Sequence, residues 1–162
     1  MTIQVGDRLP EAALMRVGED GPEPVTLSSL TAGGTVALFG VPGAFTRTCT
    51  AAHLPSFIRT KDKFAEKGVD TLICVAVNDP FVMKAWGEAS GAAEAGIHML
   101  GDAGGTFAKE MGLDFDAPAV GFFGRFRRFA MLVDDGVVRT LDTEDSPGDC
   151  SVSSGEALLE KV

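Results

Sequence analysis

The sequence has few of the residues that build disulfide frameworks or metal sites. Its 162 residues include only three cysteines, Cys49, Cys74 and Cys150. So few, widely scattered cysteines argue against the disulfide framework of a secreted domain and suit an enzyme that uses a thiol. No CxxC sequence occurs, and His53 and His98 are the only histidines. The pattern therefore predicts no zinc site.

A signal segment and a membrane-spanning segment are also missing from the sequence. The first residues, MTIQVGDRLPEAAL, lack the basic region and the apolar region of a secretory signal. No apolar run approaches the roughly 20 residues that span a bilayer. We therefore expect a cytoplasmic protein without a membrane partner.

The sequence has no excess of basic residues, since 14 Lys and Arg stand against 23 Asp and Glu. The resulting net charge of −9 would be repelled by nucleic acids and anionic membranes, which argues against both as main partners. The glycines at 101–105 lack GxGxxG spacing, so no nucleotide cofactor is predicted. The chain is 45% hydrophobic and of single-domain length, which predicts one globular domain over residues 1–162.

Apolar strands alternate with helical stretches along most of the chain. We expect strands at 36–39, 71–77 and 97–100, and helices from 49 to 68, around 81–89 and at 106–111. Strands at 129–133 and 137–141 should form a hairpin around Asp135 and Gly136. Ser153 and Glu156 have the spacing of a capping box for a C-terminal helix. The first 35 residues, with a turn at 19–24, should cover a sheet edge. This order predicts an α/β fold with a mixed sheet.

Cys49 lies where a strand gives way to a helix. Pro42 and Gly43 stop the apolar run Val36–Phe39, and the helical pattern begins at Cys49. The first turn of a helix has unpaired N–H groups and the positive end of the helix dipole, and both favour an anion. We therefore predict that Cys49 is a nucleophilic thiolate.

Pro42, Thr46 and Cys49 form a Pro-x-x-x-Thr-x-x-Cys pattern that resembles the peroxiredoxins. The longer strings FGVPGAFTRTCTAAHLPSF, VNDPFVMKAW and RRFAMLVDDG resemble the peroxiredoxin-5 or type II subfamily, and the resemblance continues through SVSSGEALLEKV. It implies a thioredoxin-like fold with a mixed central sheet flanked by helices. It also implies a thiol peroxidase that reduces hydrogen peroxide and alkyl hydroperoxides, takes electrons from glutaredoxin or thioredoxin, and forms a homodimer with an apolar patch near residues 77–83.

The catalytic candidates follow from the same strings. Cys49 would attack a peroxide oxygen and become a sulfenic acid. The Thr46 hydroxyl could accept from the peroxide and donate to the sulfur, or it could cap the helix. Pro42 could keep water away, or it could simply end the strand. Arg128 matches the family's arginine only by resemblance, because the residues alone do not separate it from Arg125 and Arg127.

The substrate pocket and the second cysteine are less closely defined. Val120, Phe122 and Phe123 could wall a pocket for alkyl groups, or they could belong to the core. Cys74 matches a second cysteine of plant-like members but lies in an apolar strand. Cys150 matches the resolving cysteine of animal-like members and lies in a polar segment that should be exposed. We favour Cys150 as the resolving cysteine.

Two other functions are compatible with a reactive Cys49. His53 lies four residues after Cys49, so a Cys-His pair could serve a cysteine hydrolase, although a structural or subunit-contact histidine is a better interpretation. The same oxidised cysteine could also serve a peroxide sensor that changes partners. A sensor would stall after one oxidation, whereas a peroxidase would turn over many times.

Overall fold

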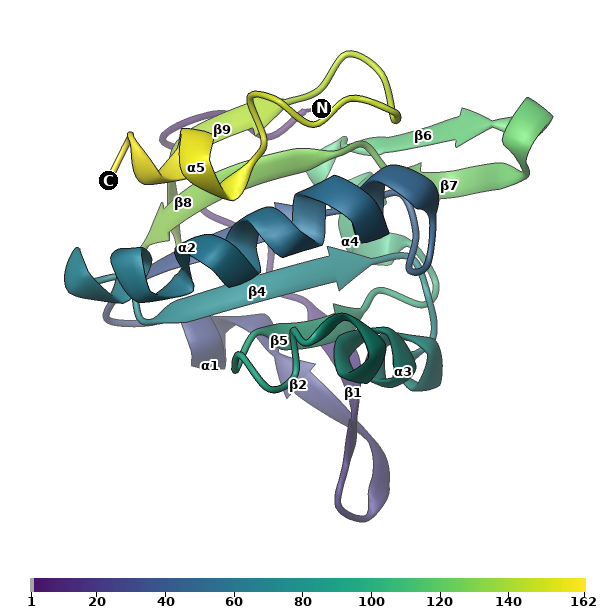
Figure 1. The fold of residues 1–162 in the computed structure, drawn as a ribbon, viewed down its shortest axis with the longest axis horizontal. Helices are drawn as coiled ribbons and strands as arrows, with labels where there is room; N and C mark the ends of the chain where they lie inside the picture. Colours follow the sequence, from purple (N-terminus) through teal and green to yellow (C-terminus); the bar gives the residue numbers. More distant parts are fainter. Residues whose placement is uncertain (1) are drawn as a thin grey trace.

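A central seven-stranded sheet organises the computed structural model, which describes residues 2–162 (Figure 1). The strands lie in the order β2, β1, β5, β4, β3, β8, β9. Their bounds are β1 Ala13–Gly18, β2 Gly21–Thr26, β3 Thr35–Gly40, β4 Thr71–Ala76, β5 His98–Gly101, β8 Phe129–Asp134 and β9 Val137–Thr143. Strands β3, β4 and β5 are parallel, and the others pair antiparallel. The predicted mixed sheet is confirmed.

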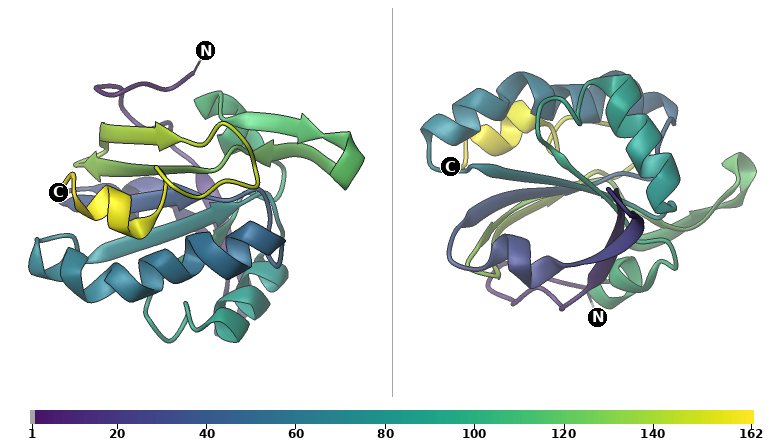
Figure 2. Two further views of the ribbon diagram at one scale, coloured as in Figure 1. Left: turned by 45° about the horizontal axis from the view of Figure 1, so that its top comes forward. Right: turned by 90° about the horizontal axis from the view of Figure 1, so that it is seen from below.

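Helices cover both faces of the sheet (Figure 2, right). Helices α2, α3 and α5 lie on one face, and α1 and α4 lie on the other. Their bounds are α1 Leu27–Thr31, α2 Leu54–Glu66, α3 Pro80–Ser90, α4 Thr106–Met111 and α5 Gly155–Leu159. This arrangement explains why β3 and β4 read as continuous apolar runs, because strands covered on both faces bury successive side chains. The predicted α/β class is confirmed.

Capping contacts fix the C-terminal end of α2 and the N-terminal end of α3. The N–H of Val69 donates to the carbonyl of Phe64, and the N–H of Gly68 donates to that of Ala65, which together end α2 in a Schellman motif. Gly68 has a φ of 86°, which glycine adopts without strain. Asp79 caps α3 by accepting from the N–H of Val82.

The first 35 residues differ from the expectation. They do not cover the sheet edge but extend it, because β1 and β2 form a hairpin and β1 pairs with β5. The chain reverses between Gly18 and Gly21, so the rest of the predicted 19–24 turn belongs to β2. Pro22 and Pro24 are tolerated there because β2 is an edge strand, where a missing N–H breaks no pairing on the open side.

A second hairpin was not predicted. Strands β6 (Asp114–Ala117) and β7 (Phe122–Phe126) form a separate two-stranded sheet, joined by the 3₁₀ turn η2 (Pro118–Val120). This hairpin projects from the body of the molecule beyond the strand ends (Figure 1).

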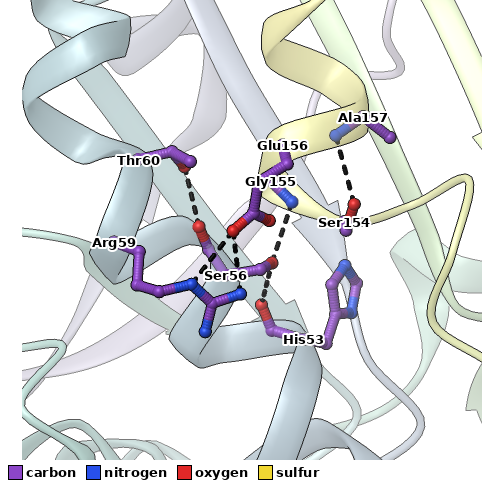
Figure 3. Close-up of polar contacts among 8 residues, drawn as sticks. All are labelled: His53, Ser56, Arg59, Thr60, Ser154, Gly155, Glu156 and Ala157. Atoms are coloured by element: carbon purple, nitrogen blue, oxygen red, sulfur yellow. Dashed lines mark hydrogen bonds and ion pairs between the residues drawn. The ribbon is translucent and has the colours of Figure 1, made fainter.

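The C-terminal hairpin and helix are present with one correction. Asp135 and Gly136 both have positive φ, as a type I′ turn requires. However, Ser154 caps α5 by accepting from the N–H of Ala157, and the predicted cap, Ser153, bonds to Glu144 instead. An ion pair between Arg59 and Glu156 holds α5 against α2 (Figure 3). Within residues 2–162, no helix is both long and apolar enough to cross a membrane.

Candidate active site

The loop after β3 is fixed by contacts from two other parts of the chain. Nη1 of Arg125 donates to the carbonyl of Pro42 at 3.0 Å. The N–H of Ala44 donates to Oδ1 of Asn78, which follows β4, at 2.9 Å. A Cβ at Gly43 would lie 2.6 Å from Nη1 of Arg125, so a larger residue there would displace the guanidinium. The loop therefore presents the next helix in a defined position.

Cys49 lies in the first turn of that helix, as predicted, because helical conformation begins at Arg47, but the turn that starts at Cys49 is wider than an α-helix. Residues Cys49–His53 form a π-helical turn, η1, which continues into α2. The N–H of Leu54 donates to the carbonyl of Cys49, five residues back. Pro55 has no N–H, so the α-helical bond to the carbonyl of Ala51 cannot form at this point. Single π turns inside helices are frequent at functional sites.

The π turn is also tied to α3. Nε1 of Trp86, which is buried, donates to Oγ1 of Thr50 at 3.2 Å. Thr50 is the residue that follows Cys49, so Trp86 contacts the turn that carries the thiol.

The Arg128 guanidinium connects the thiol to its surroundings. Its Nη2 lies 3.1 Å from Sγ of Cys49 and also donates to the carbonyl of Pro147 at 3.0 Å. Cys49 is fully buried and Arg128 is 2% exposed. A guanidinium that donates to an anionic sulfur in a buried site makes a strong, charge-assisted hydrogen bond. Among the three candidate arginines, only Arg128 has this contact: Arg125 holds the Pro42 loop and Arg127 is exposed.

One donor of Arg128 has no protein partner. Within the described chain, its Nε is the only buried side-chain nitrogen or oxygen without a hydrogen bond. Buried polar groups of this kind are rare and costly, and they often mark functional sites. This N–H is therefore open to an oxygen atom that binds or forms beside it.

His53 supports Arg128 rather than the thiol. Its Nε2 lies 2.8 Å from the carbonyl of Ser153, so Nε2 carries the proton, and Nδ1 accepts from Nη1 of Arg128 at 2.9 Å. Burial, and then the Arg128 charge, lower the pKa of His53 to about 3. The ring is neutral at physiological pH and both nitrogens are occupied, so His53 has no free nitrogen with which to act as the base of a cysteine hydrolase.

Thr46 and Pro42 lie just before the π turn. Oγ1 of Thr46 donates to the carbonyl of Gly43 at 2.6 Å, so its proton is not directed at the sulfur, contrary to one half of the expected role. Within the described chain, Oγ1 of Thr46 accepts no hydrogen bond from a helix N–H, so the side chain does not cap the helix either. The lone pairs of Thr46 Oγ1 remain available to a peroxide O–H. Pro42 is buried, as a shielding residue must be.

The two other cysteines have different surroundings. Cys74 is fully buried in β4, and burial followed by the nearby Cys49 raises its pKa well above the usual value. Cys150 lies after an exposed loop but is itself half-buried, contrary to the expected exposure. Burial also raises the pKa of Cys150.

The expected pocket residues lie on the projecting hairpin. Val120 and Phe123 are each 65% exposed, so they neither wall an enclosed pocket nor belong to the core. Phe122 packs edge-on against Phe115. A cavity of about 210 Å³ lies beside Arg128 instead, lined by Phe115, Arg127, Arg128, Glu144, Asp145 and Pro147.

Sequence reasoning missed several residues that build the site. Asn78 and Arg125 hold the Pro42 loop, the Glu144 carboxylate accepts from the segment that follows Cys150, and the carbonyl of Pro147 accepts from Arg128. Only Asn78 gave a usable signal, since a polar residue directly after a buried parallel strand often lies at a site. In the described part of the chain, no group of three or more His, Cys, Asp or Glu could hold a metal ion.

Comparisons with known proteins identify the class to which this fold and site belong. The family model described as Redoxin matches residues 4–159. Chloroplastic peroxiredoxin-2E-2 of Oryza sativa subsp. japonica is 44% identical over 165 residues, covering 99% of this chain and 73% of the relative. Peroxiredoxin-2B of Arabidopsis thaliana is 42% identical over 161 residues, covering 99% of this chain and 98% of the relative.

Solved peroxiredoxin structures are similar to this chain in both sequence and fold. Reduced Prx3 from Vibrio vulnificus in complex with hydrogen peroxide is 44% identical, with a TM-score of 0.91 and 99% of each chain covered. Peroxiredoxin 5 from Alvinella pompejana is 35% identical, with a TM-score of 0.84, covering 98% of this chain and 96% of that one. The chain therefore belongs to the redoxin family, as a peroxiredoxin of the type II or peroxiredoxin-5 kind. Its fold is thioredoxin-like and its function is that of a thiol-dependent peroxidase, so the sensor and hydrolase alternatives are not favoured.

Proposed function

We propose that this enzyme reduces hydrogen peroxide and alkyl hydroperoxides through Cys49. The observation that carries the proposal is the 3.1 Å contact between Nη2 of Arg128 and Sγ of Cys49. The thiolate attacks the terminal oxygen, an S–O bond forms while the O–O bond breaks, and the sulfur loses two electrons. The leaving oxygen takes a proton and departs as water or an alcohol. Cys49 is left as a sulfenic acid.

The surrounding groups explain how the O–O bond would be weakened. Nη2 of Arg128 stabilises the negative sulfur, and its unpaired Nε offers a further donor for an oxygen that gains charge in the transition state. Thr46 has committed its own proton to Gly43 and can therefore accept the peroxide O–H. Neutral His53 holds the guanidinium without adding a second positive charge.

Cys150 is the proposed resolving cysteine. Its sulfur would attack the sulfenic sulfur of Cys49, so that an S–S bond forms, the S–O bond breaks, and the hydroxyl leaves as water with the thiol proton. Cys74 is a poorer candidate because it is locked in a central strand and its raised pKa disfavours the thiolate. Peptide mapping after one equivalent of peroxide distinguishes the two: we expect a Cys49–Cys150 link within one chain.

Glutaredoxin or thioredoxin is the proposed source of electrons. Multiple-turnover consumption of peroxide, with thioredoxin, glutaredoxin or glutathione supplied separately, tests the proposed function. We expect many equivalents of peroxide to be consumed with at least one of them. Oxidation that stops after one equivalent with all three would favour the sensor and contradict the peroxidase. The cytoplasmic location stays a prediction.

A homodimer is proposed through the apolar surface around Phe81. Phe81, in the first turn of α3, is 60% exposed and Phe45 is 54% exposed, and the hydrogen bond from Ala44 to Asn78 joins the Phe45 loop to the segment before α3. Exposed aromatic side chains on adjacent segments are typical of contact sites. We expect a dimer by sedimentation at micromolar concentration and a shift toward monomer for Phe81→Asp. Val5→Asp is the matched control, since Val5 is exposed on the N-terminal segment. A monomeric unmodified protein would contradict the proposal.

A further inference from the structure

The loop that carries Cys150, between β9 and α5, is fixed at both ends. The N–H of Glu144 donates to the carbonyl of Arg128 at 2.9 Å and extends the pairing of β8 with β9. At the other end, the N–H of Gly155 donates to Oγ of Ser56 in α2 at 2.8 Å (Figure 3). A Cβ at Gly155 would lie 2.4 Å from the carbonyl oxygen of Ser56, so α5 is seated closely on α2. Any movement of Cys150 must therefore take place between these two anchors.

Glu144 also fastens the loop through its side chain. Glu144 is only 5% exposed, and its carboxylate accepts four hydrogen bonds, all from Ser151 and Ser153. Its Oε2 accepts from the N–H of Ser151 at 2.8 Å, from the N–H of Ser153 at 2.8 Å and from Oγ of Ser153 at 2.6 Å. Its Oε1 accepts from Oγ of Ser151 at 3.2 Å. Burial alone would raise the pKa of Glu144, but these bonds lower it overall, so the carboxylate is ionised at neutral pH.

Two further hydrogen bonds hold the residues that precede Cys150. Nη2 of Arg128 donates to the carbonyl of Pro147 at 3.0 Å, and Oγ1 of Thr48 donates to the carbonyl of Gly148 at 3.0 Å. The loop leaves β9, extends toward the β6–β7 hairpin and returns to α5 (Figure 2, left). Cys150 is therefore restrained by bonds both before and after it, and Cys49 is fully buried. The two thiols are free, so these contacts restrain the movement that would bring the sulfurs into bonding distance.

We propose that Glu144 is a positioning residue that restrains the Cys150 segment in the reduced enzyme and so sets the rate of disulfide formation. This inference rests on the proposed resolving role of Cys150. Both thiols are free, and Ser151 follows Cys150 directly, so the carboxylate restrains the movement by which the Cys150 sulfur approaches the sulfenic sulfur. A restrained Cys150 lengthens the lifetime of the sulfenic acid, during which a second peroxide can oxidise it to a sulfinic acid. Glu144 thereby sets the sensitivity of the enzyme to excess peroxide.

The variant Glu144→Gln tests this role, because it removes the negative charge and leaves one acceptor oxygen in place of two. We expect the Cys49–Cys150 disulfide to form about tenfold faster or more after one equivalent of hydrogen peroxide, since the bonds from the two serines are no longer charge-assisted. The initial oxidation of Cys49 should keep its rate, and less sulfinic acid should form in excess peroxide. Asp149→Asn is the matched control: it removes the same charge from an exposed residue of the same loop that does not line the cavity beside Arg128. An unchanged or slower disulfide step in Glu144→Gln would overturn the proposal.

A second measurement separates restraint from charge. The alkylation rate of Cys150 in the reduced protein is followed by peptide mass spectrometry across a pH series. Loss of the carboxylate charge alone moves the midpoint of this profile, whereas release of the loop also raises the limiting rate at high pH. We expect a raised limiting rate, and an unchanged one would contradict the restraint.

Two controls keep the test decisive. Ser153→Ala removes one of the four bonds and should produce a smaller effect in the same direction, with thermal unfolding measured for each variant. If the unmodified enzyme forms no Cys49–Cys150 disulfide, the resolving role of Cys150 fails. The limiting alkylation rate still decides whether Glu144 restrains Cys150.

Discussion

Cys49→Ser should abolish peroxide consumption while the protein stays folded. A serine hydroxyl is not ionised near neutral pH, and its oxygen cannot take up the peroxide oxygen as a sulfur does. The side chain is buried, and a hydroxyl is costly in an apolar site unless it is hydrogen-bonded. Arg128 already donates to this position, so the new oxygen has a partner. The measurements are peroxide consumption with reductant present and thermal unfolding by circular dichroism.

The controls for this result are the two other cysteines. Cys150→Ser should still consume one equivalent of peroxide, because its first oxidation step does not need a resolving thiol. Cys74→Ala should leave that step unchanged as well, since Cys74 is buried in β4 and makes no hydrogen bond to Cys49 or Arg128 in the described chain. Residual turnover in Cys49→Ser would refute the assignment of the nucleophile.

Arg128→Lys should reduce the rate of Cys49 oxidation by about tenfold or more. The guanidinium contacts Cys49, His53 and the carbonyl of Pro147 through two nitrogens, and an ammonium cannot reproduce this fork. Losing one transition-state hydrogen bond of about 1.4 kcal/mol already corresponds to a factor of ten. The rate is measured by rapid mixing of reduced enzyme with hydrogen peroxide, followed by quenching and mass spectrometry.

Arg127→Lys is the matched control, because Arg127 is the adjacent residue and is exposed. We expect it to keep the unmodified rate. Thermal unfolding of both variants distinguishes a loss of chemistry from a loss of structure, since the lysine would replace a buried side chain. If Arg128→Lys kept the unmodified rate and Arg127→Lys were strongly impaired, Arg127 rather than Arg128 would be the catalytic arginine.

The parts of the fold that sequence reasoning found are those where local chemistry and global packing agree. The covered strands β3 and β4 are continuous apolar runs, and the Asp135-Gly136 turn requires positive φ. Cys49 was placed in the first turn because Pro42 and Gly43 interrupt the pattern just before it. These features depend on neighbours in the sequence, so one sequence was enough.

The missed features depend on contacts between distant residues. The β6–β7 hairpin has mixed burial and no dipeptide typical of a tight turn, so its sequence did not predict a hairpin. Ser153 and Ser154 are both suitable residue types for a helix cap. Ser154 caps α5 because the Ser153 hydroxyl is bonded to Glu144, which is distant from the helix start in sequence. Arg128 was chosen by resemblance alone, and what distinguishes it physically from Arg125 and Arg127 is its 3.1 Å contact with a residue 79 positions earlier.

The bond between Trp86 and Thr50 gives the molecule an optical reporter of its redox state. Trp86 is the only tryptophan and there is no tyrosine, so one indole dominates the intrinsic fluorescence. Its Nε1–H bonds to the residue next to Cys49, on the turn that must loosen if the oxidised sulfur is to leave its buried position. Loss of that bond changes the polarity around the indole, so emission can follow each stage of the cycle in real time without an added label.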